Sequence, residues 1–156
     1  MRCKLLKIIL VLLTLSACTT QKNELKPINL IPLDTSKDFT ITSNDLNHIV
    51  TKKDLLHKIN EADVVVLGEI HTHILGHVFQ YDLLQYIVKK FPNSTLALEM
   101  LERDEQPIIE DYVEGIISDT KFASLTHSKN WAGENTWSAW YQPLIDIYKP
   151  AGNRII

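Results

Sequence analysis

The chain has 156 residues, of which 45% are apolar and 22% are charged, as is normal for one globular domain. The formal net charge of -3 becomes -6 without the basic first 17 residues, which argues against nucleic acid as a partner. Cys3 and Cys18 both lie near the N-terminus, so no disulfide framework is available to the folded part.

Residues 1–17 have the pattern of a secretory signal peptide. Arg2, Lys4 and Lys7 are followed by an apolar stretch that is too short for a transmembrane helix. The sequence LSAC then ends at Cys18 and resembles a bacterial lipobox, whose cysteine becomes the lipidated N-terminus. We therefore expect a lipoprotein with acyl chains such as palmitate on Cys18, lipid-anchored in the bacterial cell envelope. Because Thr19 rather than Asp follows, we expect the anchor in the outer membrane, facing the periplasm.

The rest of the chain divides into a tether and a domain. Residues 18–45 include the lipidated N-terminus and are polar, with two prolines and little periodicity, as a tether would be. The domain is expected over residues 46–156. Its first predicted elements are a short helix over 53–60, a β-branched buried strand over 63–69, an amphipathic helix over 75–91 and a second buried strand over 95–100.

Two further amphipathic helices are predicted over 108–117 and 137–148, and Pro143 should kink the second. The final NRII, residues 153–156, looks like the opening of a third strand. This order predicts an α/β fold, a parallel sheet with flanking helices. Because the sequence stops two apolar residues into that strand, we expect a fragment, the N-terminal part of a larger domain truncated after the onset of the third main strand.

Polar residues gather where the first two predicted strands end, in VVVLGEIHTHILGH and LALEM. Glu69 and Glu99 end these strands, and His71 follows the first. Because ligands bind at the carboxyl ends of parallel strands, we expect these three side chains to converge. They could hold a divalent metal, or activate a water as catalytic residues of a hydrolase. The alternative is structural, with both glutamates capping the following helices. His77 is expected on the helix surface.

These stretches, with LALEMLERDEQPIIEDYVEG and NWAGENTWSAWYQPLIDIYKPAG, resemble the ChaN-type haem-binding lipoproteins of the Tiki/TraB/erythromycin-esterase-like superfamily. The blocks match in order over residues 63–156, roughly the first half of that family's domain, and residues 99–106 are the most specific. The resemblance implies a haem cofactor, a role in iron acquisition or haem uptake, and a carrier rather than an enzyme. It also implies a homodimer of the full-length form that holds haem as a cofacial pair, with a tyrosine of one subunit on the iron.

The sequence also offers candidates for contact with haem. Tyr141, on an aromatic stripe, and His73 are the candidates, although the stripe also suits a packed core. Three functions stay open. The first is a haem-binding lipoprotein. The second is a metal- or carboxylate-assisted hydrolase of the same superfamily, esterase- or peptidase-like, that uses Glu69, His71 and Glu99. The third is a non-functional truncated fragment.

Overall fold

The computed structural model describes residues 25–34, 37–43, 48–151 and 154–156. The predicted signal peptide and the lipidation site at Cys18 lie outside these residues. In the described part of the chain, no helix is both long enough and apolar enough to cross a membrane. Ile28 belongs to the region interpreted as tether, yet it is fully buried, in the 3₁₀ helix η1 (Ile28–Leu30) that contacts helix α2.

A small hairpin and a capped helix precede the central part of the molecule. Strands β1 (Ile41–Ser43) and β2 (His48–Val50) pair antiparallel. Helix α1 (Lys52–Asn60) begins after Thr51, whose hydroxyl accepts from the Asp54 N–H. The Asp54 carboxylate accepts in return from the Thr51 N–H, so two N–H groups that the helix leaves unpaired are satisfied.

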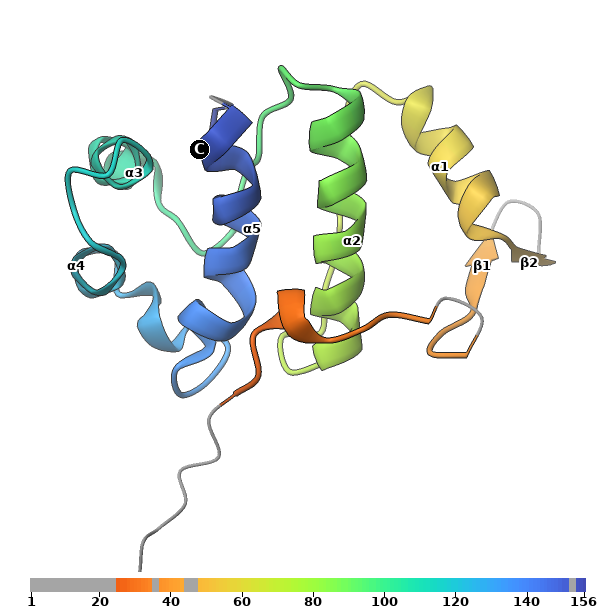
Figure 1. Ribbon diagram of the computed structural model, residues 1–156, viewed down its shortest axis with the longest axis horizontal. Helices are drawn as coiled ribbons and strands as arrows, with labels where there is room; N and C mark the ends of the chain where they lie inside the picture. The colour runs from red at the N-terminus through yellow and green to blue at the C-terminus, as the bar shows by residue number, and fades with distance from the viewer. Residues whose placement is uncertain (1–24, 35–36, 44–47, 152–153) are drawn as a thin grey trace, which may run out of the picture.

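Two helices that lie side by side form the centre of the fold (Figure 1). Helix α2 (Ile74–Lys90) matches the predicted amphipathic helix and ends at Phe91, because Pro92 disfavours helical geometry in the residue before it. Helix α5 (Gln142–Tyr148) follows a π-helical stretch, η4 (Trp137–Tyr141). The kink predicted at Pro143 is thus a change of helix type, with Pro143 in the first turn of α5, where a missing N–H costs little.

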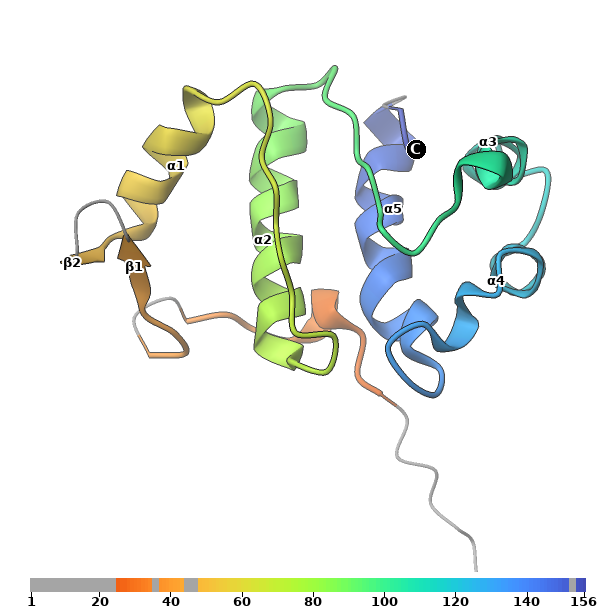
Figure 2. The ribbon, with the colours of Figure 1, turned by 180° about the vertical axis from the view of Figure 1, so that it is seen from behind.

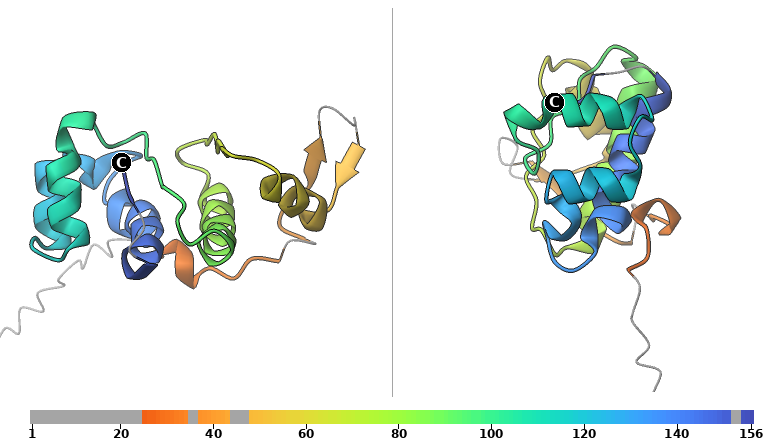
Figure 3. Two further views of the ribbon diagram at one scale, coloured as in Figure 1. Left: turned by 90° about the horizontal axis from the view of Figure 1, so that it is seen from above. Right: turned by 90° about the vertical axis from the view of Figure 1, so that its left-hand side faces the viewer.

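Helices α3 (Gln106–Val113) and α4 (Asp119–Leu125) pack on the side of α5 away from α2, as the view from above shows (Figure 3). The helix predicted over 108–117 stops early because Gly115 adopts a φ of 76°, which ends a helix without strain in a residue that lacks Cβ. No helix was predicted at α4. Tyr112 of α3 stacks on Phe122 of α4 at 4.4 Å between ring centroids. Short 3₁₀ turns complete the fold: η2 (Arg103–Glu105), η3 (Ser128–Asn130) and η5 (Lys149–Ala151).

The predicted strands are extended segments that run in the same direction along one side of α2 and α5 (Figure 2). They are not part of a parallel sheet. Among the described residues, the regular sheet is the antiparallel pair β1–β2, and parallel pairing is limited to one isolated bridge between Leu96 and Ile155. That bridge places the predicted third strand beside the second.

The prediction that residues 63–69 are buried on both faces is wrong. Val65 and Leu67 are each 37% exposed and line the space over α2 and α5, whereas Val64 is 77% and Val66 is 86% exposed. The segment keeps the alternation of a strand, but no described element covers its outer face. Burial of both faces requires layers on both sides of a sheet, and the described residues supply only the helical layer.

Candidate functional site

The carboxylate of Glu69 is the centre of the polar cluster in the first loop. Its Oε1 accepts hydrogen bonds from Nδ1 of His71 at 2.8 Å and from the hydroxyl of Tyr141 at 2.9 Å. Its Oε2 accepts from the amide of Gln80 at 2.9 Å and lies 3.5 Å from Nδ1 of His77. The cluster therefore joins the loop before α2, two turns of α2 and the end of η4.

These partners hold Glu69 in its ionised form. Burial by itself raises the pKa of the carboxyl group, because the charged form loses water. The hydrogen bonds from Gln80, His71 and Tyr141 and the charge of His77 outweigh burial, so the pKa of Glu69 lies below its usual value. The side chain is only 14% exposed. Glu69 is thus a partly buried anion that lies among four neighbouring side chains.

His77 supports the loop from beneath, which corrects the expectation of a surface position. It is 1% exposed, and its ring stacks on Trp140 with 4.7 Å between centroids. Nε2 of His77 donates to the carbonyl oxygen of His71 at 2.9 Å, since a carbonyl only accepts. Helix α2 therefore holds both the carboxylate of Glu69 and the backbone of His71, the residue that Glu69 orients.

One ring nitrogen of His71, Nε2, makes no hydrogen bond with another described residue. Its side chain is 47% exposed, and Nδ1 is occupied by Glu69. When the imidazole is neutral and Nδ1 holds the proton, Nε2 has a free lone pair. A carboxylate behind a histidine in this way is the arrangement that orients metal-binding histidines and raises their basicity. The ring also contacts Trp131 edge to face, with 5.7 Å between centroids.

In His73, the second histidine of the loop, Nδ1 accepts a hydrogen bond, whereas Nδ1 of His71 donates one. His73 is the N-cap of α2, and its Nδ1 accepts from the N–H of Gly76 at 3.1 Å. A neutral His73 must then have its proton on Nε2, which makes the exposed nitrogen a donor. A Cβ at position 76 would lie 3.1 Å from Nδ1 of His73, so glycine leaves room for this cap.

Tyr141 is a buried hydrogen-bond donor in this structure. It is 1% exposed; burial, followed by the hydrogen bond to Glu69 and the charges of Glu69 and Glu99, raises the pKa of its phenol. The phenol is therefore protonated and already bound to a carboxylate. Tyr112 and Tyr148 are equally buried, and the hydroxyl of Tyr86 donates to Asn60.

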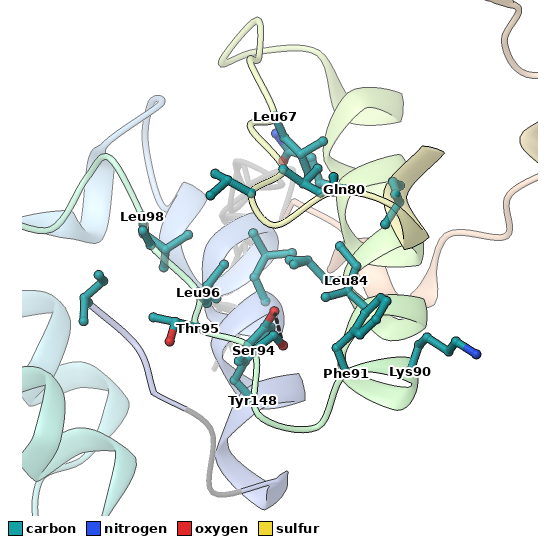
Figure 4. A pocket seen from close by; sticks show the side chains of 18 of the residues that line it. Leu67, Gln80, Leu84, Lys90, Phe91, Ser94, Thr95, Leu96, Leu98 and Tyr148 are labelled. Carbon is teal, nitrogen blue, oxygen red and sulfur yellow. Dashed lines mark hydrogen bonds between the residues drawn. The ribbon is translucent and has the colours of Figure 1, made fainter. Parts of the chain in front are cut away.

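Glu99 lies at the carboxyl end of the second extended segment and borders the same groove as Glu69 and Tyr141. The groove has a volume of about 1040 Å³ and lies over α2 and α5, between the two segments (Figure 4). Glu99 is exposed and is not among the hydrogen-bond or ion-pair partners of Glu69 and His71. Among the described residues, no group of three or more His, Cys, Asp or Glu side chains is placed to hold a metal ion.

Sequence reasoning missed several residues of this cluster. Gln80 and Trp131 were not considered, and His77 was assigned to solvent. A signal for Gln80 was available in hindsight, because residues 73, 77 and 80 recur at helical spacing and so share one face of α2. No local pattern indicates that Tyr141 reaches Glu69, since 72 positions separate them.

Comparison with known proteins agrees with the resemblance seen in the sequence. A family model described as haem-binding uptake, Tiki superfamily, ChaN, matches residues 55–156, well over half of the chain. The matched region includes the Glu69 cluster, both exposed imidazoles of the loop and the groove. Comparison with curated proteins and with solved structures found no significant match. The chain belongs to the ChaN family of haem-binding uptake proteins in the Tiki superfamily.

Proposed function

We propose that the protein binds haem for haem uptake, and that His71 would hold the iron through Nε2. The observation that supports this assignment is the pair formed by His71 and Glu69, which leaves Nε2 exposed with its lone pair available. Haem, when bound, would supply a ferric iron that accepts a nitrogen or oxygen ligand. Of the candidate ligands considered, His71 is the one that is both oriented by a second residue and open to solvent.

The surroundings of His71 also suit a porphyrin. Three exposed apolar side chains lie near His71. Ile70 and Ile74, which are 74% and 43% exposed, lie at the two ends of its loop, and Trp131, which is 40% exposed, contacts the His71 ring. An exposed aromatic and two aliphatic side chains offer apolar area to a flat macrocycle. Nε2–H of His73 is a donor suited to a haem propionate.

The same geometry favours a carrier over a hydrolase. A general base or a metal ligand needs a carboxylate oxygen with a free lone pair. Hydrogen bonds from His71, Tyr141 and Gln80 take up three of the four lone pairs of the Glu69 carboxylate, and its pKa is lowered, so the carboxylate is a weak base. We assign Glu69 to the support of His71.

We further propose that the protein acts at the envelope, anchored through acyl chains on Cys18 in the outer membrane and facing the periplasm, in iron acquisition. The LSAC sequence supports this. Cys18→Ala should move the protein from the membrane fraction to the soluble periplasm. An intact mass without a lipid adduct on the wild-type protein would rule the anchor out. A homodimer of the full-length form, implied by the resemblance, belongs to the same proposal.

Titration with ferric haem, followed by visible absorption and electron paramagnetic resonance, tests the ligand. The wild-type protein should give a spectrum with nitrogen ligation, and His71→Ala should lose it and weaken binding by about tenfold or more. His57→Ala, which removes an exposed histidine of α1, is the matched control and should bind as the wild type does. A phenolate-to-iron charge-transfer band in both variants would assign the iron to a tyrosine instead. A titration that shows no absorbance other than that of free haem would refute haem binding.

A further inference from the structure

The groove over α2 and α5 has the size and the lining of a site for an elongated apolar molecule. Its volume of about 1040 Å³ lies at the upper end of the range of small-molecule sites. Leu84 of α2 and Leu144 of α5 are among the residues of its floor. Its walls are residues 63–69 on one side and 94–99 on the other, and both run in the same direction (Figures 2 and 4). The groove is therefore longest along the direction that the walls share.

Both walls offer apolar side chains that are still partly open to water. Val65 and Leu67 line the groove from the first wall and are each 37% exposed. Leu98 lines it from the second wall and is also partly exposed. The residues of the first wall are exposed up to Gly68, so water satisfies their backbone groups, and these place no demand on an occupant. An alkyl chain that lay along the three side chains would remove apolar area from water.

The two walls end in carboxylates at the same end of the groove. Glu69 ends the first wall and Glu99 the second, and both line the groove. Both lie near enough to Tyr141 that their charges, after burial, raise the pKa of its phenol. Glu99 is exposed and makes no hydrogen bond or ion pair with another described residue. This end of the groove therefore has a negative charge that no described side chain neutralises.

The opposite end has charges of both signs. Lys90, at the end of α2, lines it together with Asp63 and Glu61 (Figure 4). A carboxylate oxygen of Glu61 also lies 3.9 Å from Nζ of Lys58. The unbalanced charge is thus at the Glu99 end, which favours an occupant with one cationic head over one with a cation at each end.

A primary ammonium suits the acidic end better than other head groups do. A carboxylate only accepts hydrogen bonds, and an ammonium offers three donors and a positive charge. An alkylamine is protonated at neutral pH, as the side chain of lysine is. The carboxylate of a fatty acid or the phosphate of a phospholipid would instead meet the like charges of Glu69 and Glu99.

We propose that the groove binds a long-chain primary amine, with its ammonium beside Glu99 and Glu69 and its alkyl chain along Val65, Leu67 and Leu98. The chain would run toward the Lys90 end, parallel to the walls. The inference goes beyond haem binding and does not depend on it.

Calorimetric titration of the purified full chain with decylamine at neutral pH tests the proposal. Decylamine should bind, and hexylamine should bind more weakly, by about twofold or more for each CH₂ group that is lost. Decanoate, which has the same chain length and the opposite charge, should bind several-fold more weakly than decylamine. Equal binding of decylamine and decanoate would show a nonspecific apolar surface and overturn the proposal. Tighter binding of lysophosphatidylethanolamine than of decylamine would assign the groove to a phospholipid and also overturn it.

A neutral substitution at the acidic end tests the position of the head group. Glu99→Gln should weaken the binding of decylamine by about threefold or more, the effect of an exposed ion pair, and should not weaken the binding of decanoate. Glu114→Gln, at the exposed C-cap of α3 and outside the groove, is the matched control and should bind decylamine as the wild type does. If the two variants bind decylamine alike, the ammonium does not lie beside Glu99 and the proposal is wrong.

Two neighbouring positions of the first wall test the position of the alkyl chain. Leu67→Ser should reduce the gain in affinity from hexylamine to decylamine, because the Leu67 side chain lines the groove. Val66→Ser should keep the whole gain, since Val66 is 86% exposed and does not line the groove. Equal gains in the two variants would show that the chain lies elsewhere, which contradicts the proposal.

Discussion

The hydroxyl of Tyr141 donates a 2.9 Å hydrogen bond to Oε1 of Glu69, and so ties the end of η4 to the loop before α2. The same oxygen accepts from His71, so the orientation of an exposed imidazole depends on a phenol buried beneath it. If His71 binds haem as proposed, Tyr141 would affect that binding through the orientation of His71. This relationship also gives the first prediction.

Tyr141→Phe should lower the free energy of unfolding by about 1.5–3 kcal/mol, the usual cost of losing a hydrogen bond to a charged group. Chemical denaturation measures this. Tyr86→Phe is the matched control, because its hydroxyl also donates to an oxygen, of Asn60, but in an exposed setting. The control should cost less than about 1 kcal/mol. Equal losses in the two variants would mean that the buried carboxylate gains nothing special from Tyr141.

The pH dependence of stability should show the lowered pKa of Glu69. A carboxyl group whose folded pKa is below its unfolded value of about 4.5 adds stability above that value and loses it as the pH falls through the folded pKa. The difference in unfolding free energy between the wild type and Glu69→Gln should therefore be largest near neutral pH and shrink below pH 4.5. If the difference is constant across this range, Glu69 does not stabilise the fold through its ionised form.

Tyr141 should cause a second loss of stability, at alkaline pH, because its pKa is shifted upward whereas that of Glu69 is shifted downward. Its folded pKa is raised above the usual value of 10, so the stability that it contributes is complete below pH 10 and is lost as the pH rises through the folded pKa. Tyr141→Phe should lack this alkaline component. Unfolding curves of both proteins above pH 10, with phenolate absorbance at each pH, make the comparison.

His77→Ala should destabilise the protein by about 2–4 kcal/mol, because it removes a buried ring stacked on Trp140 and the donor to the His71 carbonyl. His57→Ala, at an exposed position of α1, should stay within about 0.5 kcal/mol of the wild type. Thermal and chemical unfolding should rank the variants identically. If both histidines prove equally dispensable, His77 has no supporting role.

The helices could be predicted from the sequence where the pattern was local. The predicted range 75–91 agrees with α2 within a residue at each end, since its apolar period and Pro92 are both local signals. Helix α4 was missed because its seven residues contain only two buried side chains, Phe122 and Ala123, too few to show a period. Helix α3 ends early because Gly115 has a positive φ. The apolar pattern continues to residue 117, so it predicted a longer helix.

The site was predictable in its residue types and less so in its contacts. Glu69 and His71 could be placed together because they are two positions apart at the end of an apolar run. The burial of His77 and the bond to Tyr141 depend on how α2 packs against η4 and α5, which no short window of sequence contains. The parallel sheet was inferred from apolar runs that show where strands form. A parallel sheet also needs a neighbouring strand at each edge, and among the described residues the only parallel bridge is the one between Leu96 and Ile155.

The last prediction concerns the outer face of the first extended segment. Val66 is 86% exposed, whereas Val78 on α2 is 2% exposed, so the same substitution at the two positions should have opposite consequences. Val66→Lys should change the free energy of unfolding by no more than about 0.5 kcal/mol, because little apolar area is lost. It should also reduce binding of a hydrophobic dye and slow aggregation, since a charge on an open strand edge opposes edge-to-edge pairing. Val78→Lys would bury an unpaired charge between helices and should abolish the cooperative transition. If Val66→Lys unfolds the protein as Val78→Lys does, the outer face of residues 63–69 is covered in solution.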